Sequence, residues 1–394
     1  MKHKISTSEK VLLIEQYLTE NYELRYNLLN KKTEVRARSN EQGKDFEPLT
    51  NKMKNSMVRQ TKIDLEELTC VRQDVLEYLD SSAIPQYDPI RDYLNGLPRW
   101  DGQNRVAELF SRIPGTSSEQ ILWLSIWMRS AVAHWLGMDT LHGNECVPTL
   151  IGAQGSGKST FCHRLLPEHL RQYFLDHLNL SNKNDKEMAL TNNLLVNLDE
   201  MDQIRPTQQA ELKQTLSKPK VNGRPIYGRE QQDRTRYASF LATTNNRHPL
   251  QDKTGSRRYL CISIPKGALI DNETPINYEQ LYAQLVKEVR EDGMRYWFTN
   301  EETRQIQQVN QQFQQETDLS AMLQTCFRVP NEQERPQSQV MTVKEICGIL
   351  KEEYPAMQQD KSLSIHVGMR MHELGFERKT LNKGNAYHVI NLIA

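Results

Sequence analysis

The chain has 394 residues, and its 50 lysines and arginines balance 50 aspartates and glutamates, so its formal net charge at pH 7 is zero. This length allows two or three domains with buried cores. The balanced charge excludes any inference about partners from net charge, so only local charge can indicate them. The six cysteines form no Cys-x-x-Cys pair, which argues against a zinc site or a disulfide framework and fits a reducing cytoplasm.

The N-terminal residues do not resemble a signal peptide, because they lack a continuous apolar segment and a small-residue cleavage site. Ser6 and Glu9 precede an apolar run, which is typical of a capping box at the start of a helix. Residues 121–138 are mostly apolar and could imitate a membrane span, but Arg129 lies near their centre. A charge there costs about 2.5–3.5 kcal/mol in lipid. We therefore expect a buried helix of a cytoplasmic protein with no membrane partner.

The first regions of the chain differ in their patterns. Residues 1–85 predict a helix, a hairpin with strands over 23–29 and 33–38, and further helices. Residues 86–145 are rich in turn signals and then helical, and they lead into the next region. Strand and helix patterns alternate over 146–265, which predicts an α/β fold with a mostly parallel sheet.

The remaining regions are smaller. Residues 266–328 predict helices with glutamine-rich faces, and residues 329–340 have the composition of a linker. Residues 341–394 show two amphipathic helices and then two strands, which is a winged-helix pattern. Such a unit can bind DNA or protein, and both possibilities remain open. The outward basic candidates are His366, Arg370, Arg378, Lys379 and Lys383.

A phosphate-binding loop is predicted over residues 152–159, which match the pattern G-x-x-x-x-G-K-S in full. Glycines let the backbone turn its N–H groups toward phosphate oxygens, Lys158 reaches the β- and γ-phosphates, and the Ser159 hydroxyl ligates Mg²⁺. A strand over 147–151 and a helix over 159–166 flank the loop, and the helix N-terminus favours phosphate. A glycine-rich turn without a ligand is the alternative. The expected ATP-binding residues are Gly152, Ala153, Gln154, Gly155, Ser156, Gly157, Lys158, Ser159 and Thr160.

The second half of the predicted site follows an apolar strand over 194–198. Asp199 is expected to hold Mg²⁺ through water, and Glu200 to activate or orient the attacking water. Two solvated acids at a strand end are the alternative, but the preceding phosphate loop favours a catalytic interpretation.

A further strand, over 238–242, ends in Thr243, Thr244 and Asn245. An amide there can bond the γ-phosphate or the attacking water, although an asparagine at a strand end is often only a turn residue. Arg257 and Arg258 precede a strand over 259–264. A guanidinium at a site edge can stabilise phosphoryl-transfer charge in a neighbouring subunit, although a surface arginine is often only a solvated charge.

Together these motifs resemble the virulence-associated protein E family of P-loop ATPases, which is similar to superfamily 3 helicases and primase-helicases of the AAA+ class. The resemblance covers about residues 87–316. Besides the phosphate loop, it rests on YDPIRDYLNGLPRWDG, NLDE, GRPIYGR, ATTNN, GSRRY and YWFTNEETRQIQQVNQQF. One departure is the lack of a polymerase-type acidic motif for priming.

The resemblance implies an AAA+ core in a ring oligomer, with a hexamer expected and ATP at subunit interfaces. It implies that Asn245 is the sensor asparagine and Arg258 the arginine finger acting in trans, with Arg257 as a second candidate. Superfamily 3 relatives move along single-stranded DNA through the centre of the ring.

Residues 205–236 carry eight basic against three acidic residues, a local net charge of +5. In superfamily 3 relatives this interval holds a hairpin that grips DNA in the channel. We expect phosphate contacts or stacking from this stretch, although some of its residues could contact nucleotide or a neighbouring subunit. The candidates are Lys218, Lys220, Arg224, Tyr227 and Arg229.

These features predict a Mg²⁺-dependent ATPase of helicase or translocase type that acts on DNA in the replication or mobilisation of a mobile element. The alternative is an initiator or scaffold that uses ATP to assemble on DNA without unwinding it. Glu200 and the arginine pair favour the enzyme, because a scaffold needs neither.

Overall fold

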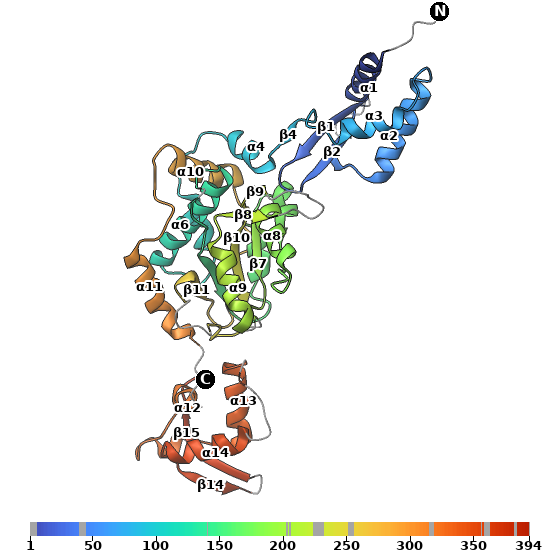
Figure 1. Cartoon of the computed structure of the whole chain (residues 1–394). Helices are drawn as coiled ribbons and strands as arrows, with labels where there is room; N and C mark the ends of the chain where they lie inside the picture. The colour runs from blue at the N-terminus through green and yellow to red at the C-terminus, as the bar shows by residue number, and fades with distance from the viewer. Residues whose placement is uncertain are drawn as a thin grey trace, which may run out of the picture.

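The computed structural model shows three units in a row, with a large central α/β unit between two smaller ones (Figure 1). The structure describes residues 6–38, 45–139, 141–201, 204, 206–223, 232–250, 256–314, 319–355, 357, 363–381 and 384–393.

The N-terminal unit packs three helices against a small sheet with strand order β3-β2-β1-β4. The predicted capping box forms at the first helix, because the Ser6 hydroxyl accepts from the Glu9 N–H at 3.2 Å and the Glu9 carboxylate accepts from the Ser6 N–H at 2.8 Å. The predicted hairpin is also confirmed, and its buried Asn27 donates to the Tyr173 hydroxyl of the central unit at 2.7 Å. The elements are α1 (Thr7–Asn21), β1 (Tyr22–Asn27), β2 (Lys32–Ala37), β3 (Glu47–Pro48), α2 (Asn51–Asp64), α3 (Val71–Leu79) and β4 (Gln86–Tyr87).

The apolar stretch forms α6 (Ser118–Trp135), which is buried along most of its length. Arg129 pairs with Glu288 at 3.1 Å inside the unit, so its charge is compensated there. Among the described residues, none of the helices is long and apolar enough to cross a membrane. Two short helices precede α6, α4 (Pro89–Asn95) and α5 (Arg105–Phe110).

The central sheet has five strands in the order β11-β5-β10-β7-β6, and every neighbouring pair is parallel. The prediction of a parallel α/β fold is therefore confirmed. The strands are β5 (Val147–Ile151), β6 (Phe174–Leu175), β7 (Leu195–Leu198), β10 (Ser239–Thr244) and β11 (Tyr259–Ser263).

Helices cover both faces of this sheet. The core on one face includes residues of α6, α7 and α10, and the core on the other face includes residues of α8 and α9. An antiparallel hairpin of β8 and β9 connects α9 to β10. The bounds are α7 (Lys158–His163), α8 (Lys183–Asn192), α9 (Pro206–Ser217), β8 (Lys220–Gly223), β9 (Gln232–Thr235), α10 (Tyr278–Arg290) and α11 (Asn300–Asn310).

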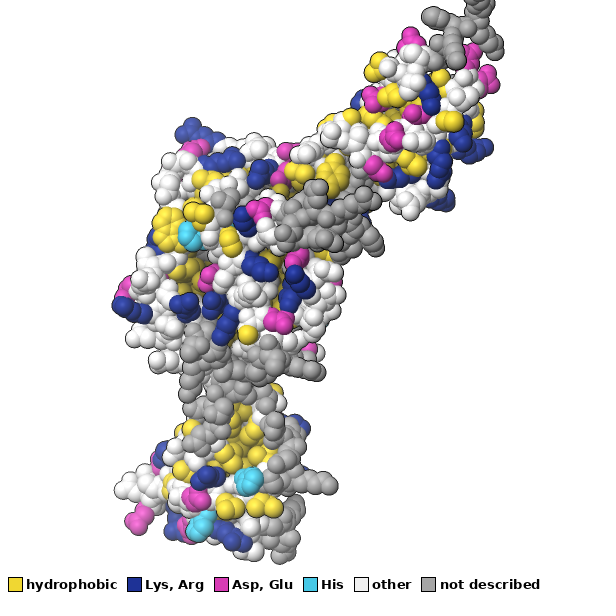
Figure 2. Space-filling model, viewed as in Figure 1, with side chains coloured by type: hydrophobic (Ala, Val, Ile, Leu, Met, Phe, Trp, Pro, Cys, Tyr) yellow, Lys and Arg dark blue, Asp and Glu magenta, His cyan; other side chains and the backbone are white. Residues whose placement is uncertain are grey.

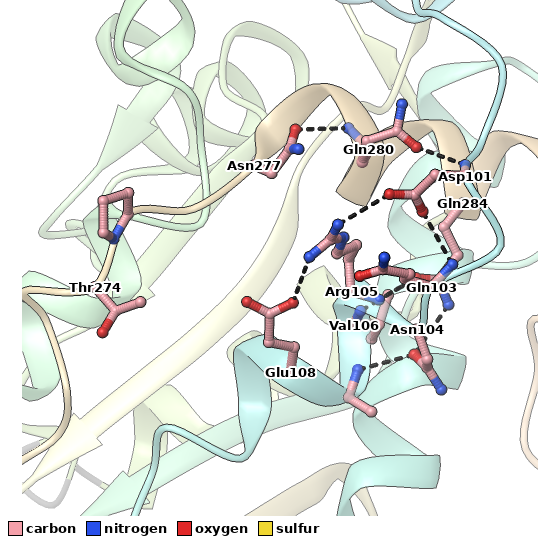
Figure 3. Close-up of polar contacts among 12 residues, drawn as sticks. Asp101, Gln103, Asn104, Arg105, Val106, Glu108, Thr274, Asn277, Gln280 and Gln284 are labelled. Carbon is pink, nitrogen blue, oxygen red and sulfur yellow. Dashed lines mark hydrogen bonds and ion pairs between the residues drawn. The ribbon is translucent and has the colours of Figure 1, made fainter.

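Glutamines of α10 hold the turn-rich segment before α5 in place (Figure 3). The Gln284 side-chain oxygen accepts from the backbone N–H groups of Arg105 at 2.7 Å and Val106 at 3.2 Å, at the start of α5. These are N–H groups that a helix cannot satisfy internally. Gln280 accepts similarly from the N–H of Asp101 at 2.7 Å.

The C-terminal unit contains the two predicted helices and the predicted pair of strands, with Leu350, Val367 and Met371 in its core. Met369 of the same helix is instead exposed, with an exposed fraction of 57%. The elements are α12 (Leu319–Cys326), β12 (Phe327–Arg328), β13 (Gln339–Thr342), α13 (Val343–Glu353), α14 (Leu363–Glu373), β14 (Arg378–Leu381) and β15 (Gly384–Asn391).

This unit starts earlier than the predicted boundary at residue 341. Leu323 and Phe327 are buried in its core, and β12 pairs with β15. The stretch over 329–340, expected to be a linker, includes a short 3₁₀ helix and the first residues of β13. Its polar composition reflects exposure at the surface rather than a connection between domains.

Candidate functional site

The glycine-rich loop begins where β5 ends, between the ends of two neighbouring strands. Thr244 at the end of β10 lies beside Ile151 at the end of β5, and the Gly152 N–H donates to the Thr244 carbonyl at 3.2 Å. On the other side, Ser263 of β11 lies beside Ile151. The loop and the residues after β10 therefore share the carboxyl edge of the sheet, where ligands bind in open α/β folds.

Two glycines of the loop have backbone conformations that other residues rarely adopt. Gly155 has φ +80° and Gly157 has φ +87°, both in the left-handed region. A Cβ atom at Gly157 would also lie 2.5 Å from the Asn272 side-chain nitrogen. The shape of the loop thus requires glycine at these two positions, of which Gly157 is a fixed glycine of the motif.

The helix after the loop is shorter than predicted. α7 has six residues and ends at His163, three residues before the predicted end at Leu166. Pro167 follows that stretch, and a proline disfavours helix in the residue before it. A helix this short leaves most of any phosphate binding to the loop and its lysine.

Lys158 connects the loop to the strand beside it. Its ammonium group donates to the carbonyls of Gly152 at 2.8 Å and Ala153 at 2.9 Å, and to the Asn245 side-chain oxygen at 2.9 Å. The lysine is 7% exposed. Burial lowers the pKa of Lys158, and the negative charge of Asp199 acts in the opposite direction.

The Asn245 amide is oriented by this contact. Its oxygen accepts from the ammonium group, so its NH₂ group points to the other side of the amide plane. An amide NH₂ group can donate to a phosphate oxygen or to a water. The structure thus brings two of the predicted site residues, Lys158 and Asn245, into direct contact.

The predicted acidic pair directly follows β7. The Asp199 carboxylate accepts a hydrogen bond from the Thr243 hydroxyl of the adjacent strand β10. Glu200 is one of three described non-glycine residues with a positive φ, at +50°. Both acids are exposed, as are Ser159 and Thr160 at the start of α7 and Ala153 and Gln154 in the loop.

Sequence reasoning missed the segment after β11, which packs against the loop. Ile264 lies against Gly152, with 3.0 Å from its Cβ to an ideal Cβ at the glycine. The Ile270 N–H donates to the Ser156 carbonyl at 3.0 Å, and the Asn272 side chain donates to the Gly157 carbonyl at 3.0 Å. Nothing in the local sequence of this segment indicates such contacts.

The paired arginines lie at the opposite edge of the sheet. They precede Tyr259, which lies beside Val147 at the start of β5, whereas the loop follows the end of that strand. The five residues of β5 separate the two edges by about 13 Å. Arg258 Nε lies 3.5 Å from Glu145 Oε2, and Arg257 is exposed. The structure therefore does not bring either arginine to the loop of its own chain.

In the basic stretch before β10, several of the basic side chains that the structure describes are buried or paired with acids. Arg236 is 2% exposed, donates to four backbone carbonyls, and has its pKa lowered by burial to about 10. Arg234 pairs with Glu187 at 2.6 Å, and Lys220 pairs with Asp233 across the hairpin. On the face shown in Figure 2, basic side chains of the central unit are interspersed with acidic ones.

Of the other residues predicted to contact nucleic acid in this stretch, the structure describes only Lys218. Lys218 is half-buried at the end of α9, and its backbone carbonyl accepts from Arg236. The remaining candidates from this stretch, Arg224, Tyr227 and Arg229, lie outside the described residues.

In the C-terminal unit, four of the basic residues that were expected to face outward are exposed, namely His366, Arg370, Arg378 and Lys379. The fifth, Lys383, lies outside the described residues. Arg370 pairs with Glu373 one helical turn away, and the Arg378 Nε donates to the Asn385 side chain at 3.1 Å. A groove of about 670 Å³ between α14 and the β14–β15 strands is lined partly by Ile365 and Met369.

A family model described as "Virulence-associated protein E-like domain" matches residues 94–315. Among solved structures, the A form apo structure of the NrS-1 C-terminal region is 13% identical, with a TM-score of 0.44, covering 97% of this chain and 99% of that chain. A second apo structure of the same region is 11% identical, with the same TM-score, covering 98% and 99%. No curated protein matches the chain.

Proposed function

The chain belongs to the virulence-associated protein E-like family, and from this membership and the site geometry we propose that it is a Mg²⁺-dependent ATPase. In this proposal, hydrolysis in a ring oligomer drives movement on DNA during replication or mobilisation of a mobile element. The core would be of the AAA+ class, and the C-terminal unit a winged helix. The observation that carries the proposal is the contact of Lys158 with Asn245 at a glycine-rich loop beside Asp199.

The donor set of the site fits a nucleotide with Mg²⁺. The hydroxyl of Ser159 and the carboxylate of Asp199 offer the hard oxygen ligands that Mg²⁺ prefers, directly or through water. The hydrogen bond from Thr243 would hold the carboxylate in one orientation. When bound, Mg²⁺ would neutralise part of the phosphate charge.

The chain's own residues would then act on the triphosphate. Lys158, which now donates to two loop carbonyls, would turn its N–H bonds to phosphate oxygens. Asn245 would donate its amide to the γ-phosphate or the attacking water. The strained backbone of Glu200 costs on the order of 1–3 kcal/mol, and such strain is often found at functional sites. Its carboxylate would orient the attacking water or take its proton.

The position of the arginines supports a ring. Arg258 cannot reach the loop of its own chain, because it lies at the opposite edge of the sheet. In a head-to-tail ring, that edge of one subunit can face the nucleotide of the next, so Arg258, or Arg257 beside it, would act in trans. A hexamer with single-stranded DNA in its channel is the assembly we propose.

Replacement of Lys158 tests the ATP site. Lys158→Ala is expected to lose ATP binding by about a hundredfold or more, because it removes the ammonium group that would contact the phosphates. Lys183→Ala is the matched control, since that lysine side chain is 80% exposed at the start of α8. Binding of a fluorescent ATP analogue gives the comparison, and equal affinity of Lys158→Ala and the wild type would refute the site.

A forked DNA substrate separates the motor from the scaffold alternative. The motor predicts ATP-dependent strand separation that is lost in Glu200→Gln, although this variant still binds ATP. ATP hydrolysis without strand separation would support the scaffold that assembles on DNA.

A further inference from the structure

The residues directly after Asn245 touch the C-terminal unit at the end of α13. Arg247 Nη1 lies 3.0 Å from Glu353 Oε2, and His248 Nε2 lies 3.4 Å from Glu353 Oε1. The His248 ring also stacks on Tyr354, with centroids 4.8 Å apart and an interplanar angle of 19°. Two adjacent residues of the central unit therefore hold two adjacent residues of the C-terminal unit.

Much of this contact is shielded from water. The side chains of Glu353 and His248 are 12% and 14% exposed, while that of Arg247 is 49% exposed. The nearby His248 ring and the charge of Arg247 lower the pKa of the Glu353 carboxyl against the effect of its burial. Because a shielded charge without its partner is costly, this contact constrains the two units more than an exposed ion pair does.

The same loop is tied to the nucleotide site at its other end. Asn245 accepts from Lys158, and the next residue, Asn246, is 3% exposed. The Asn246 N–H donates to the Thr244 hydroxyl at 3.0 Å, and the Asn246 side chain accepts from the His248 N–H at 2.9 Å. These local bonds make a short, stiff connection between Lys158 and the Glu353 contact.

We propose that Arg247 and His248, held by Glu353, are positioning residues for Asn245, so that the C-terminal unit is coupled energetically to the nucleotide site. The inference rests on the proposed function, because it requires a nucleotide beside Lys158. The C-terminal unit lies outside the matched family domain, so the contact would let a separate unit influence that domain. Coupling between two sites is reciprocal. Bound ATP must therefore also stabilise the end of α13.

Glu353→Gln tests the proposal with little change of shape, and Glu352→Gln is the matched control. Glu352 is the preceding residue of the same helix and is exposed. Removing the Glu353 charge should weaken ATP binding by at least about fivefold, a typical coupling between two sites, and should also lower kcat for ATP hydrolysis. ADP affinity should stay within about twofold, since ADP lacks the γ-phosphate that Asn245 would contact. Glu352→Gln should match the wild type in all three.

Exchanging the charges of Arg247 and Glu353 distinguishes a positioning role from a loss of folding. Arg247→Glu and Glu353→Arg should each slow hydrolysis, and the double variant should recover part of the rate, because it restores an ion pair. Thermal unfolding of every variant measures its stability. Hydrogen exchange at residues 350–354 gives a further test. Its rate should fall when ATP binds the wild type but not when ATP binds Glu353→Gln, and a contact that only stabilises the fold would not produce this difference.

The possible outcomes distinguish this inference from the proposed function. The inference alone is overturned if Glu353→Gln hydrolyses ATP at the wild-type rate and ATP still slows its hydrogen exchange at residues 350–354. The inference is also overturned if the folded double variant recovers none of the hydrolysis rate and ATP does not change hydrogen exchange at residues 350–354 of the wild type. If Lys158→Ala binds ATP as well as the wild type does, the proposed function itself fails.

Discussion

Lys158 is held by acceptors from two segments of the chain, and this arrangement shows how single residues define the site. In its own loop, two carbonyls and, at 3.5 Å, the Ser156 hydroxyl accept from it, and Asn245 accepts from 87 positions later. Asp199 is held in a similar way by the Thr243 hydroxyl of the neighbouring strand. A lysine and a carboxylate are thus oriented by amide and hydroxyl groups of β10 and the residue after it.

The contact from Thr243 leads to a prediction at this scale. Thr243→Val keeps the side-chain shape and removes the hydrogen bond, so the Asp199 carboxylate loses its fixed orientation. The Mg²⁺ concentration that half-saturates ATP hydrolysis should rise by about tenfold, as for other partners of metal ligands.

The control is Thr149→Val on the adjacent strand β5. Thr149 is also fully buried, but its hydroxyl donates to the Val147 carbonyl of its own strand at 3.0 Å. A Mg²⁺ titration that does not distinguish the two variants would contradict the role of Thr243.

At the scale of elements, short apolar runs were enough to locate the strands. β5 has the predicted bounds, Val147–Ile151, and β7 differs from the prediction by one residue. The contacts between elements were not predictable, since their partners lie far apart in sequence. One example is Gln284 of α10, which accepts from an N–H group at the start of α5. Another is Ile270, whose N–H donates to the Ser156 carbonyl of the glycine-rich loop. Arg236 is a different case, because composition cannot distinguish a buried arginine from one that binds DNA.

The early start of the C-terminal unit can be tested with two fragments. Residues 319–394 should unfold cooperatively on heating, whereas residues 341–394 should not fold. The shorter fragment lacks Leu323, Cys326 and Phe327, which are at most 1% exposed. Each such loss costs about 2–5 kcal/mol, and the sum is comparable to the stability of a small domain. Circular dichroism during heating measures both, and equal cooperativity would place the boundary at 341.

At the scale of the whole molecule, the sheet separates two parts of the proposed reaction. Its carboxyl edge carries the loop, Asp199 and Asn245, and its amino edge carries Arg258. A single chain therefore lacks an arginine at its own loop among the predicted site residues that the structure describes. Two copies arranged head to tail would supply it.

Hydrolysis by mixed subunits tests the central claim, a shared ATP site in a ring, most directly. Lys158→Ala subunits lack the loop lysine but keep the arginine, and Arg258→Ala subunits have the reverse defect. Each variant alone should be inactive. Mixed rings should recover hydrolysis, because an intact loop then meets an intact arginine across some interfaces. If the mixture stays as inactive as the separate variants, the claim that Arg258 acts in trans is contradicted.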